Sequence, residues 1–154
     1  PYSLDRAQDA ALQKTVPTLA ELTTTAIARM RQNGKGFVLQ VEGGKVDWAA
    51  HANDVGGLLY DQLAFDEAVK VAVEFAEKDG NTLVVITTDH GNANPGLFSG
   101  GQANRNFDRI QQFKHTNDWI LNGITKDFTA AQVAERVEAA QRIVLKPDEA
   151  QSLL

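Results

Sequence analysis

Two short stretches of the sequence gather side chains of the kinds that bind divalent metals. VEGGKVDWAAH contains Glu42, Asp47 and His51 within ten residues, and TTDHGN places Asp89 directly before His90. Asp47 and His51 are four residues apart, so a helical turn would put both side chains on one face, where they can share an ion. Carboxylate with imidazole suits zinc, whereas an all-oxygen site that uses Glu42 suits magnesium.

Each group also has an ordinary explanation. An Asp-His pair is common in a solvated loop, and an Asp/His pair at i,i+4 is common on a helix surface. Ionised carboxylates and neutral imidazoles are costly to bury together unless a cation joins them, so two such groups on one rim favour a metal centre.

The surrounding elements are expected to bring the two groups together. Residues 36–41 and 82–87 are short, apolar and rich in β-formers, and each is preceded by a segment with helical periodicity, from Pro17 to Gly34 and over 58–78. This alternation predicts an α/β fold with a parallel sheet. Because ligands bind at the carboxyl ends of such strands, Glu42 and the Asp89–His90 pair are expected on the same rim.

The chain after this block is expected to be helical. Apolar residues over 107–123 predict one amphipathic helix, Thr129 with Gln132 predicts a capped helix over 130–142, and Pro147 predicts the start of a last short helix. The sequence therefore divides into a core at 1–103, which carries the metal-ligand motifs, and an all-helical appendix at 104–154.

Composition limits the possible functions. The 154 residues have a net charge of −5 and no cysteine, which argues against a nucleic-acid partner and removes disulfides and thiolate ligands. No apolar stretch approaches the roughly 20 residues that cross a bilayer, so no membrane partner is expected. The absence of an initiator Met at Pro1 indicates a processed chain or a piece of a longer one.

The motifs resemble those of the alkaline phosphatase family. VEGGKVDWAAHAND, LAFDEAV and DGNTLVVITTDHGN are similar to that family over residues 36–92 and follow in the same order. The resemblance implies a three-layer α/β/α sandwich, two zinc ions and one magnesium ion, and hydrolysis of phosphate monoesters through a phosphoserine intermediate. It also implies a periplasmic or secreted enzyme that can form a homodimer.

The resemblance assigns roles residue by residue. Glu42 resembles the magnesium carboxylate, Asp47 and His51 resemble ligands of the first zinc, and Asp89 and His90 resemble ligands of the second. Trp48 falls where relatives carry a variable, often basic residue beside the phosphate. An indole there loses a direct charge contact, and packing near the rim explains it equally well.

Other parts of the family pattern are missing. The nucleophilic serine is expected upstream, because Ser3, Ser99 and Ser152 lack its context; Ser99 is expected in a loop. His115 is expected on a helix surface rather than on zinc. Relatives carry their third zinc histidine near the C-terminus, after an insertion that the helical appendix resembles, so the resemblance implies that this ligand lies beyond Leu154. We therefore expect an internal piece of an alkaline phosphatase, holding about half of each metal site and inactive alone.

Two alternatives remain open from the sequence. TTDHGNAN also resembles the TADHGN stretch of metal-dependent phosphomutases, although VEGG with Asp47 and His51 fits phosphatases better. The other alternative is a non-catalytic interaction module whose contact surface uses Phe107, Phe113 and Trp119, although core packing explains these aromatic residues equally. Measured zinc content distinguishes a metal-dependent enzyme from an interaction module, because a module should bind no zinc.

Overall fold

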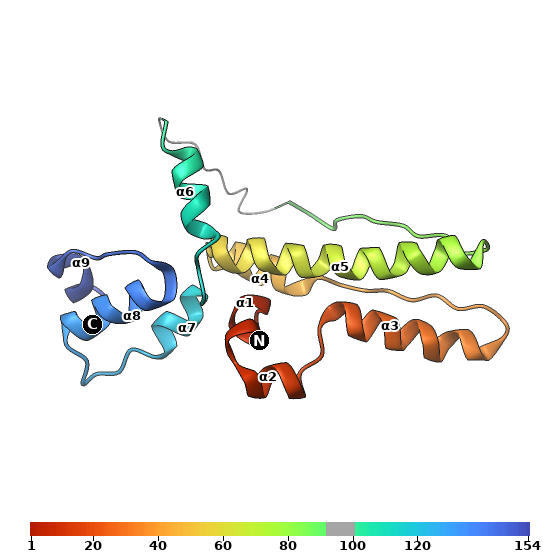
Figure 1. The fold of residues 1–154 in the computed structure, drawn as a ribbon, viewed down its shortest axis with the longest axis horizontal. Coiled ribbons are helices and arrows are strands. Elements are labelled where there is room, and N and C mark those ends of the chain that lie inside the picture. Colours follow the sequence, from red (N-terminus) through yellow and green to blue (C-terminus); the bar gives the residue numbers. More distant parts are fainter. Residues whose placement is uncertain (92–100) are drawn as a thin grey trace.

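A computed structural model describes residues 1–91 and 101–154. The molecule is elongated, with two long helices lying side by side and a group of short helices at one end (Figure 1). Its first half contains α1 (Ser3–Gln8), α2 (Ala10–Thr15), α3 (Leu19–Met30), a 3₁₀ turn at Arg31–Asn33, α4 (Gly44–His51) and α5 (Val55–Asp79).

Local capping signals set the ends of the two long helices. Thr18 and Glu21 form a capping box that starts α3, so Pro17 lies just before the helix instead of in its first turn. The sequence-based helix over 58–78 is confirmed but begins earlier, because the Asp54 side chain accepts a hydrogen bond from the Gly57 N–H. α5 ends at Gly80 in the left-handed conformation, as its sequence predicted.

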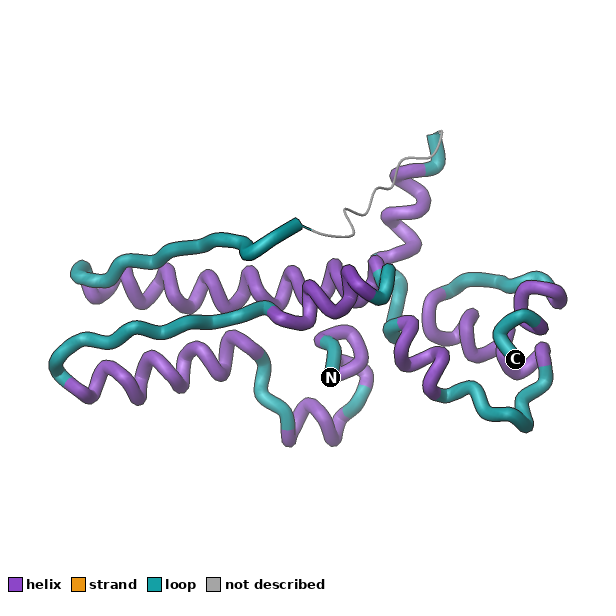
Figure 2. The backbone as a smooth tube through the Cα atoms, turned by 180° about the vertical axis from the view of Figure 1, so that it is seen from behind, coloured by secondary structure: helices purple, strands orange, loops and turns teal. Residues whose placement is uncertain are grey.

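The predicted α/β sandwich with a parallel central sheet is wrong for the described residues. They contain no β-strand: residues 36–41 and 82–87 run as extended stretches beside the helices, without backbone hydrogen bonds to another segment (Figure 2). A β-forming sequence becomes a strand only when a neighbour pairs with its backbone, and the neighbours here are helices.

Burial along the first stretch still alternates with the period of an extended chain. Phe37, Leu39 and Val41 are half-buried, while the residues between them are exposed. Phe37 lies on α5, where its ring centroid is 6.2 Å from that of Phe75. Large apolar side chains are consequently exposed on both stretches: Val38 (93%), Leu83 (86%), Val85 (73%) and Ile86 (59%).

The second half of the chain is helical, as predicted, but divided differently. The single helix expected over 107–123 is two helices, α6 (Ala103–Ile110) and α7 (Asn117–Asn122). The capping box of Thr129 and Gln132 is confirmed at the start of α8 (Ala130–Gln141), and α9 (Pro147–Gln151) begins at the predicted proline. Ile120, Val137 and Ala140 form a small apolar core between α7 and α8.

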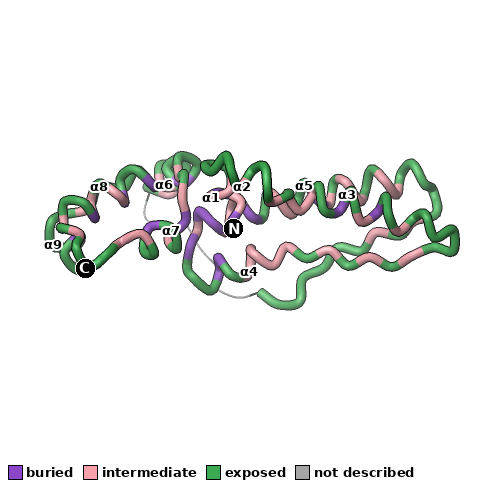
Figure 3. Tube along the Cα trace, turned by 90° about the horizontal axis from the view of Figure 1, so that it is seen from below, coloured by how far each residue is buried: buried purple, intermediate pink, exposed green. Residues whose placement is uncertain are grey.

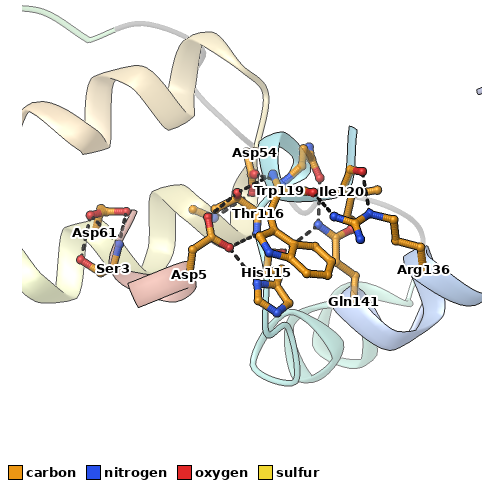
Figure 4. Close-up of polar contacts among 12 residues, drawn as sticks. Ser3, Asp5, Asp54, Asp61, His115, Thr116, Trp119, Ile120, Arg136 and Gln141 are labelled. Carbon is orange, nitrogen blue, oxygen red and sulfur yellow. Dashed lines mark hydrogen bonds and ion pairs between the residues drawn. The ribbon is translucent and has the colours of Figure 1, made fainter. Parts of the chain in front are cut away.

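Two carboxylates join the helices around α7 to the first half of the chain. Asp5 accepts hydrogen bonds from the Thr116 N–H (3.0 Å) and hydroxyl (2.7 Å), and its other contact is to His115 Nδ1 (3.0 Å). Asp54, which is 3% exposed, accepts from the Asn117 N–H as well as from Gly57. Figure 4 shows these contacts meeting at the start of α7.

One group of buried positions lies where α1, α4 and the start of α5 meet, and others lie on α3, α7 and α8 (Figure 3). Gly56 and Gly57 allow this close approach, because a Cβ on Gly56 would lie 2.7 Å from the Phe113 ring and one on Gly57 would lie 3.3 Å from Ala49. Asn53 makes the preceding turn in the left-handed region at φ 52°, which asparagine tolerates. α4 is thereby fixed against α5.

We expect Asp54→Ala to lower the free energy of unfolding by about 2–4 kcal/mol, because it removes a helix cap and leaves the N–H groups of Gly57 and Asn117 without their acceptor. Urea unfolding of the chain measures this change. Asp66→Ala, an exposed residue of α5, is the matched control and should change the unfolding free energy by less than about 0.5 kcal/mol. Equal effects of the two substitutions would contradict the linking role of Asp54.

Asp61 should make the stability depend on pH. Burial raises the pKa of this carboxyl above its ordinary 3.8, although hydrogen bonds from Ser3 and the charge of Lys45 act against the rise. The folded state therefore holds this proton more tightly than the unfolded state, so the contribution of Asp61 to stability falls as pH rises from about 3.8 through the raised pKa.

Asp61→Asn should remove the pH-dependent loss of stability that Asp61 causes. In urea unfolding, the free energy of unfolding of the variant should rise relative to that of the wild type between pH 3.8 and the raised pKa. Above that pKa the difference between the two proteins should stay constant. A stability difference that stays the same from pH 3.5 to pH 7 would contradict the raised pKa.

Candidate metal centre

The structure brings the two predicted groups of ligands together. Asp47 and His51 lie one turn apart on α4, and their separation, from Oδ1 to Nε2, is 3.5 Å. His90, at the end of the second extended stretch, places its Nε2 3.8 Å from the same Asp47 oxygen. Asp89 Oδ2 lies 3.3 Å from His90 Nε2. Asp47 therefore lies between imidazoles from two segments that are 39 residues apart in the sequence.

Local hydrogen bonds hold the second segment in place. The His90 N–H donates to Asp89 Oδ1 at 3.0 Å, and the Thr88 hydroxyl donates to the His90 carbonyl at 2.7 Å. These bonds fold residues 88–90 back on themselves, so that the His90 side chain faces α4. The ring is half exposed, at 51%.

Asp47 Oδ1 is the least satisfied atom in this cluster. It is buried from solvent, yet within the described residues it has no hydrogen-bond partner. The nearest imidazole nitrogens lie at 3.5 and 3.8 Å, beyond normal hydrogen-bond length. Two donors on one tetrahedral zinc ion, each about 2.0–2.2 Å from it, lie roughly 3.3–3.6 Å apart. The 3.5 Å between Asp47 and His51 falls in this range and suits two ligands of one cation, whereas the 3.8 Å between Asp47 and His90 lies outside it.

These residues fit part of a metal centre. Among residues 1–91 and 101–154, no set of three or more His, Cys, Asp or Glu side chains is arranged to hold a metal ion. The donor types suit zinc, and the exposed imidazole of His51 (71%) leaves room for further ligands.

Glu42 is not joined to the other four residues. Its exposed carboxylate makes no hydrogen bond or ion pair with any part of the chain that the structure describes, and it lies over Gly44. A Cβ on Gly44 would approach Glu42 Oε1 to 3.1 Å, so the glycine leaves space for this carboxylate. Magnesium binding by Glu42 stays a prediction.

Trp48 lies beside Asp47 on α4 and is 59% exposed, and both roles considered from the sequence stay predictions. Lys45 Nζ covers one face of the indole, 3.5 Å from the ring centroid. This contact was missed in the sequence, although Lys45 and Trp48 are three residues apart on a predicted helical turn. The linking aspartates Asp5 and Asp54 were also missed, and only the N-cap pattern before Val55 gave a signal for Asp54.

His115 has a different position from the one predicted. It lies in the bend before α7 instead of on a helix, with a side chain that is only 18% exposed. Its ring is stacked on Trp119 with centroids 3.7 Å apart, and Asp5 holds Nδ1. His115 is therefore part of the junction between the two halves. Ser99 lies outside the described residues.

Comparison with known proteins identifies the family. The family model for alkaline phosphatase matches residues 1–150. The chain belongs to the alkaline phosphatase family. It is 32% identical over 153 residues to alkaline phosphatase 3 of Bacillus subtilis, and 50% identical over 78 residues to alkaline phosphatase of Escherichia coli.

Structural comparison gives the same family. The crystal structure of Thermus thermophilus alkaline phosphatase matches 98% of the chain with a TM-score of 0.89 at 30% identity. The chain spans only a part of these relatives. It covers 32% of the Bacillus protein, 32% of the Thermus chain and 17% of the Escherichia protein. In the other direction, the match includes 99% of this chain for the Bacillus protein, 98% for the Thermus chain and 51% for the Escherichia protein.

The helices of residues 1–91 and 101–154 give no sign of a membrane span. None of them combines the length and apolar character needed to cross a bilayer.

Asp47→Asn should separate a metal ligand from a structural residue. In the presence of a chelator the variant should be as stable as the wild type or up to about 1 kcal/mol more stable, because it replaces a carboxylate oxygen that has no hydrogen-bond partner. Zinc affinity should fall at least about tenfold, because the amide is a weaker ligand than the carboxylate. Urea unfolding with chelator and zinc competition with a coloured indicator measure the two effects.

Asp66→Asn on α5 is the matched control and should change neither property. A large loss of stability for Asp47→Asn in the chelator would show that Asp47 has a structural partner, and an unchanged zinc affinity would remove it from the candidate ligands.

Proposed function

We propose that the full-length protein containing this chain is a metal-dependent alkaline phosphatase that hydrolyses phosphate monoesters, and that this chain forms one side of its metal centre. The observation that carries the proposal is the Asp47 carboxylate, whose buried oxygen lies near the imidazoles of His51, on the same helix, and His90, 43 residues along the chain, without a hydrogen bond to either. Family membership supports the hydrolysis of phosphate monoesters, and the cluster around Asp47 supports the location of the metal centre in the molecule.

Each residue of the cluster has a role in this proposal. Asp47 and His51 would hold one zinc ion, Asp89 and His90 would hold a second, and Glu42 would hold magnesium. Bound divalent cations supply positive charge that polarises the phosphoryl oxygens and stabilises the leaving oxygen. The protein's part is to fix the donors: α4 sets the spacing of Asp47 and His51, and the folded-back segment 88–90 brings His90 to them.

The nucleophile is proposed to come from another part of the full-length protein. The Ser3 hydroxyl donates to Asp61 at 2.8 Å, and the Ser152 hydroxyl donates to the Glu149 carbonyl at 2.7 Å. Both hydroxyls are engaged in hydrogen bonds within the fold, and Ser3 belongs to α1 instead of the cluster. A phosphoserine intermediate would therefore form on a serine that neither of these positions supplies, and we propose that the isolated chain is inactive.

Family membership favours the phosphatase over the phosphomutase alternative. The non-catalytic module is disfavoured by the cluster, because a binding surface has no need of a buried carboxylate oxygen without a partner.

Location and assembly rest on the family resemblance alone. We propose a periplasmic or secreted enzyme, with the helical region 104–154 as an insertion that caps the active site or contributes to a homodimer. Exposed apolar side chains of this region, Leu121 (52%) and Phe107 (42%), are compatible with such a contact.

The proposal is tested by assaying p-nitrophenyl phosphate with zinc and magnesium, using the 154-residue chain and the full-length protein in parallel. The isolated chain should show little or no turnover, and the full-length protein should show turnover that a chelator abolishes and zinc restores. Robust, metal-dependent turnover by the isolated chain would overturn the proposal that the nucleophile lies elsewhere. An inactive full-length protein with zinc bound would overturn the proposed activity.

A further inference from the structure

A large aromatic side chain is left exposed at the position next to Asp47 in the chain. Trp48 follows Asp47 on α4, so the two side chains leave the helix about 100° apart. Its exposed fraction is 59%. An indole that solvent reaches at the edge of a polar cluster offers a flat apolar surface to a bound molecule.

Lys45 and Tyr2 support the indole from one side. Lys45 Nζ lies 3.5 Å from the Trp48 ring centroid and 4.8 Å from that of Tyr2, so the ammonium group contacts both rings. Tyr2 is 7% exposed, and the next residue, Ser3, is bonded to Asp61 of α5. The series Tyr2–Lys45–Trp48 therefore connects an exposed ring to the rigid part of the fold through cation–π contacts.

No carboxylate competes for Lys45 in direct contact. Within the described residues its ammonium group makes no ion pair, although the negative charge of Asp61 is near enough for Lys45 to influence its pKa. Lys45 is half-buried. The aromatic rings are thus its principal partners, and its position fixes the orientation of the Trp48 ring.

We propose that Lys45 positions the Trp48 indole as a flat wall of the phosphate-ester site, and that this wall favours monoesters with planar, aromatic leaving groups. This inference rests on the proposed phosphatase function. With the phosphoryl group at the Asp47 cluster, a planar leaving group stacks on the free face of the indole, whereas a small polyol makes little contact with it. Lys45 acts through Trp48 and is a positioning residue.

The experiment compares kcat/KM for phenyl phosphate and for glycerol 2-phosphate in the full-length protein. The two esters differ in intrinsic reactivity, so the informative quantity is the change in their ratio between variants. Trp48→Leu should lower the ratio about 2- to 10-fold, the range expected for one aromatic contact. Lys45→Met should lower it in the same direction by a smaller factor, and Lys45→Arg should restore it because guanidinium also stacks on indole.

A binding measurement accompanies the kinetics. Phenylphosphonate and methylphosphonate, which are not hydrolysed, are compared by calorimetry, and the preference for the phenyl compound should fall with the same variants. Lys70→Met on α5, where Lys70 pairs only with exposed Glu74, is the matched control and should leave both ratios unchanged. Thermal unfolding confirms that each variant is folded under the assay conditions.

The outcomes separate this inference from the proposed function. A wild-type protein that hydrolyses neither ester overturns the phosphatase proposal. A wild-type protein that is active, with a ratio and a phosphonate preference that Trp48→Leu leaves unchanged, overturns the aromatic wall alone. A ratio lowered by Trp48→Leu and unchanged by Lys45→Met overturns the positioning role of Lys45.

Discussion

The structure depends on one buried carboxylate, that of Asp54. It caps α5 through the Gly57 N–H and binds the Asn117 N–H at the start of α7. One side chain therefore fixes the turn from α4 into α5 and attaches the C-terminal helices. A buried charge is stable only when its hydrogen bonds are complete, so this position tolerates little rearrangement of the three elements it joins. The direction of α4, which carries Asp47 and His51, follows from it.

The junction has a second connection that acts beside Asp54. Asp5 binds Thr116, which is fully buried, and holds His115 against Trp119. The guanidinium of Arg136 lies over the Trp119 ring, 3.7 Å from its centroid, and its Nε donates to the Ile120 carbonyl at 2.8 Å. Polar contacts with defined directions therefore join the two halves, whereas the apolar core of the C-terminal helices is small. The junction between the two halves is therefore formed mainly by charged and aromatic side chains.

The candidate metal centre has the opposite character. Asp54 and Asp5 have their hydrogen bonds completed by the chain, whereas Asp47 Oδ1 has none among the described residues. A carboxylate whose oxygens all accept hydrogen bonds stabilises a fold. A carboxylate with an oxygen that lacks a donor, beside two imidazoles, is suited to bind a cation. The contrast between carboxylates that lie on neighbouring elements distinguishes the residues proposed for chemistry from those that hold the structure. It also draws attention to Trp48, because this exposed residue directly follows Asp47 in the chain.

The sequence by itself determined the features that depend on near neighbours. Capping boxes at Thr18 and Thr129, the left-handed stop at Gly80 and the i,i+4 spacing of Asp47 and His51 are fixed within one or two turns of chain. The tertiary structure decided what depends on distant partners. Residues 36–41 and 82–87 are extended but form no sheet, because pairing requires a neighbouring backbone, and the helix expected over 107–123 is divided at the bend that Asp5 binds. The approach of His90 to Asp47 was expected from a sheet that the described residues lack, and it arises instead where the second stretch turns back toward α4. A side chain's own sequence context sets its local conformation, but only the packed chain sets which distant group it meets.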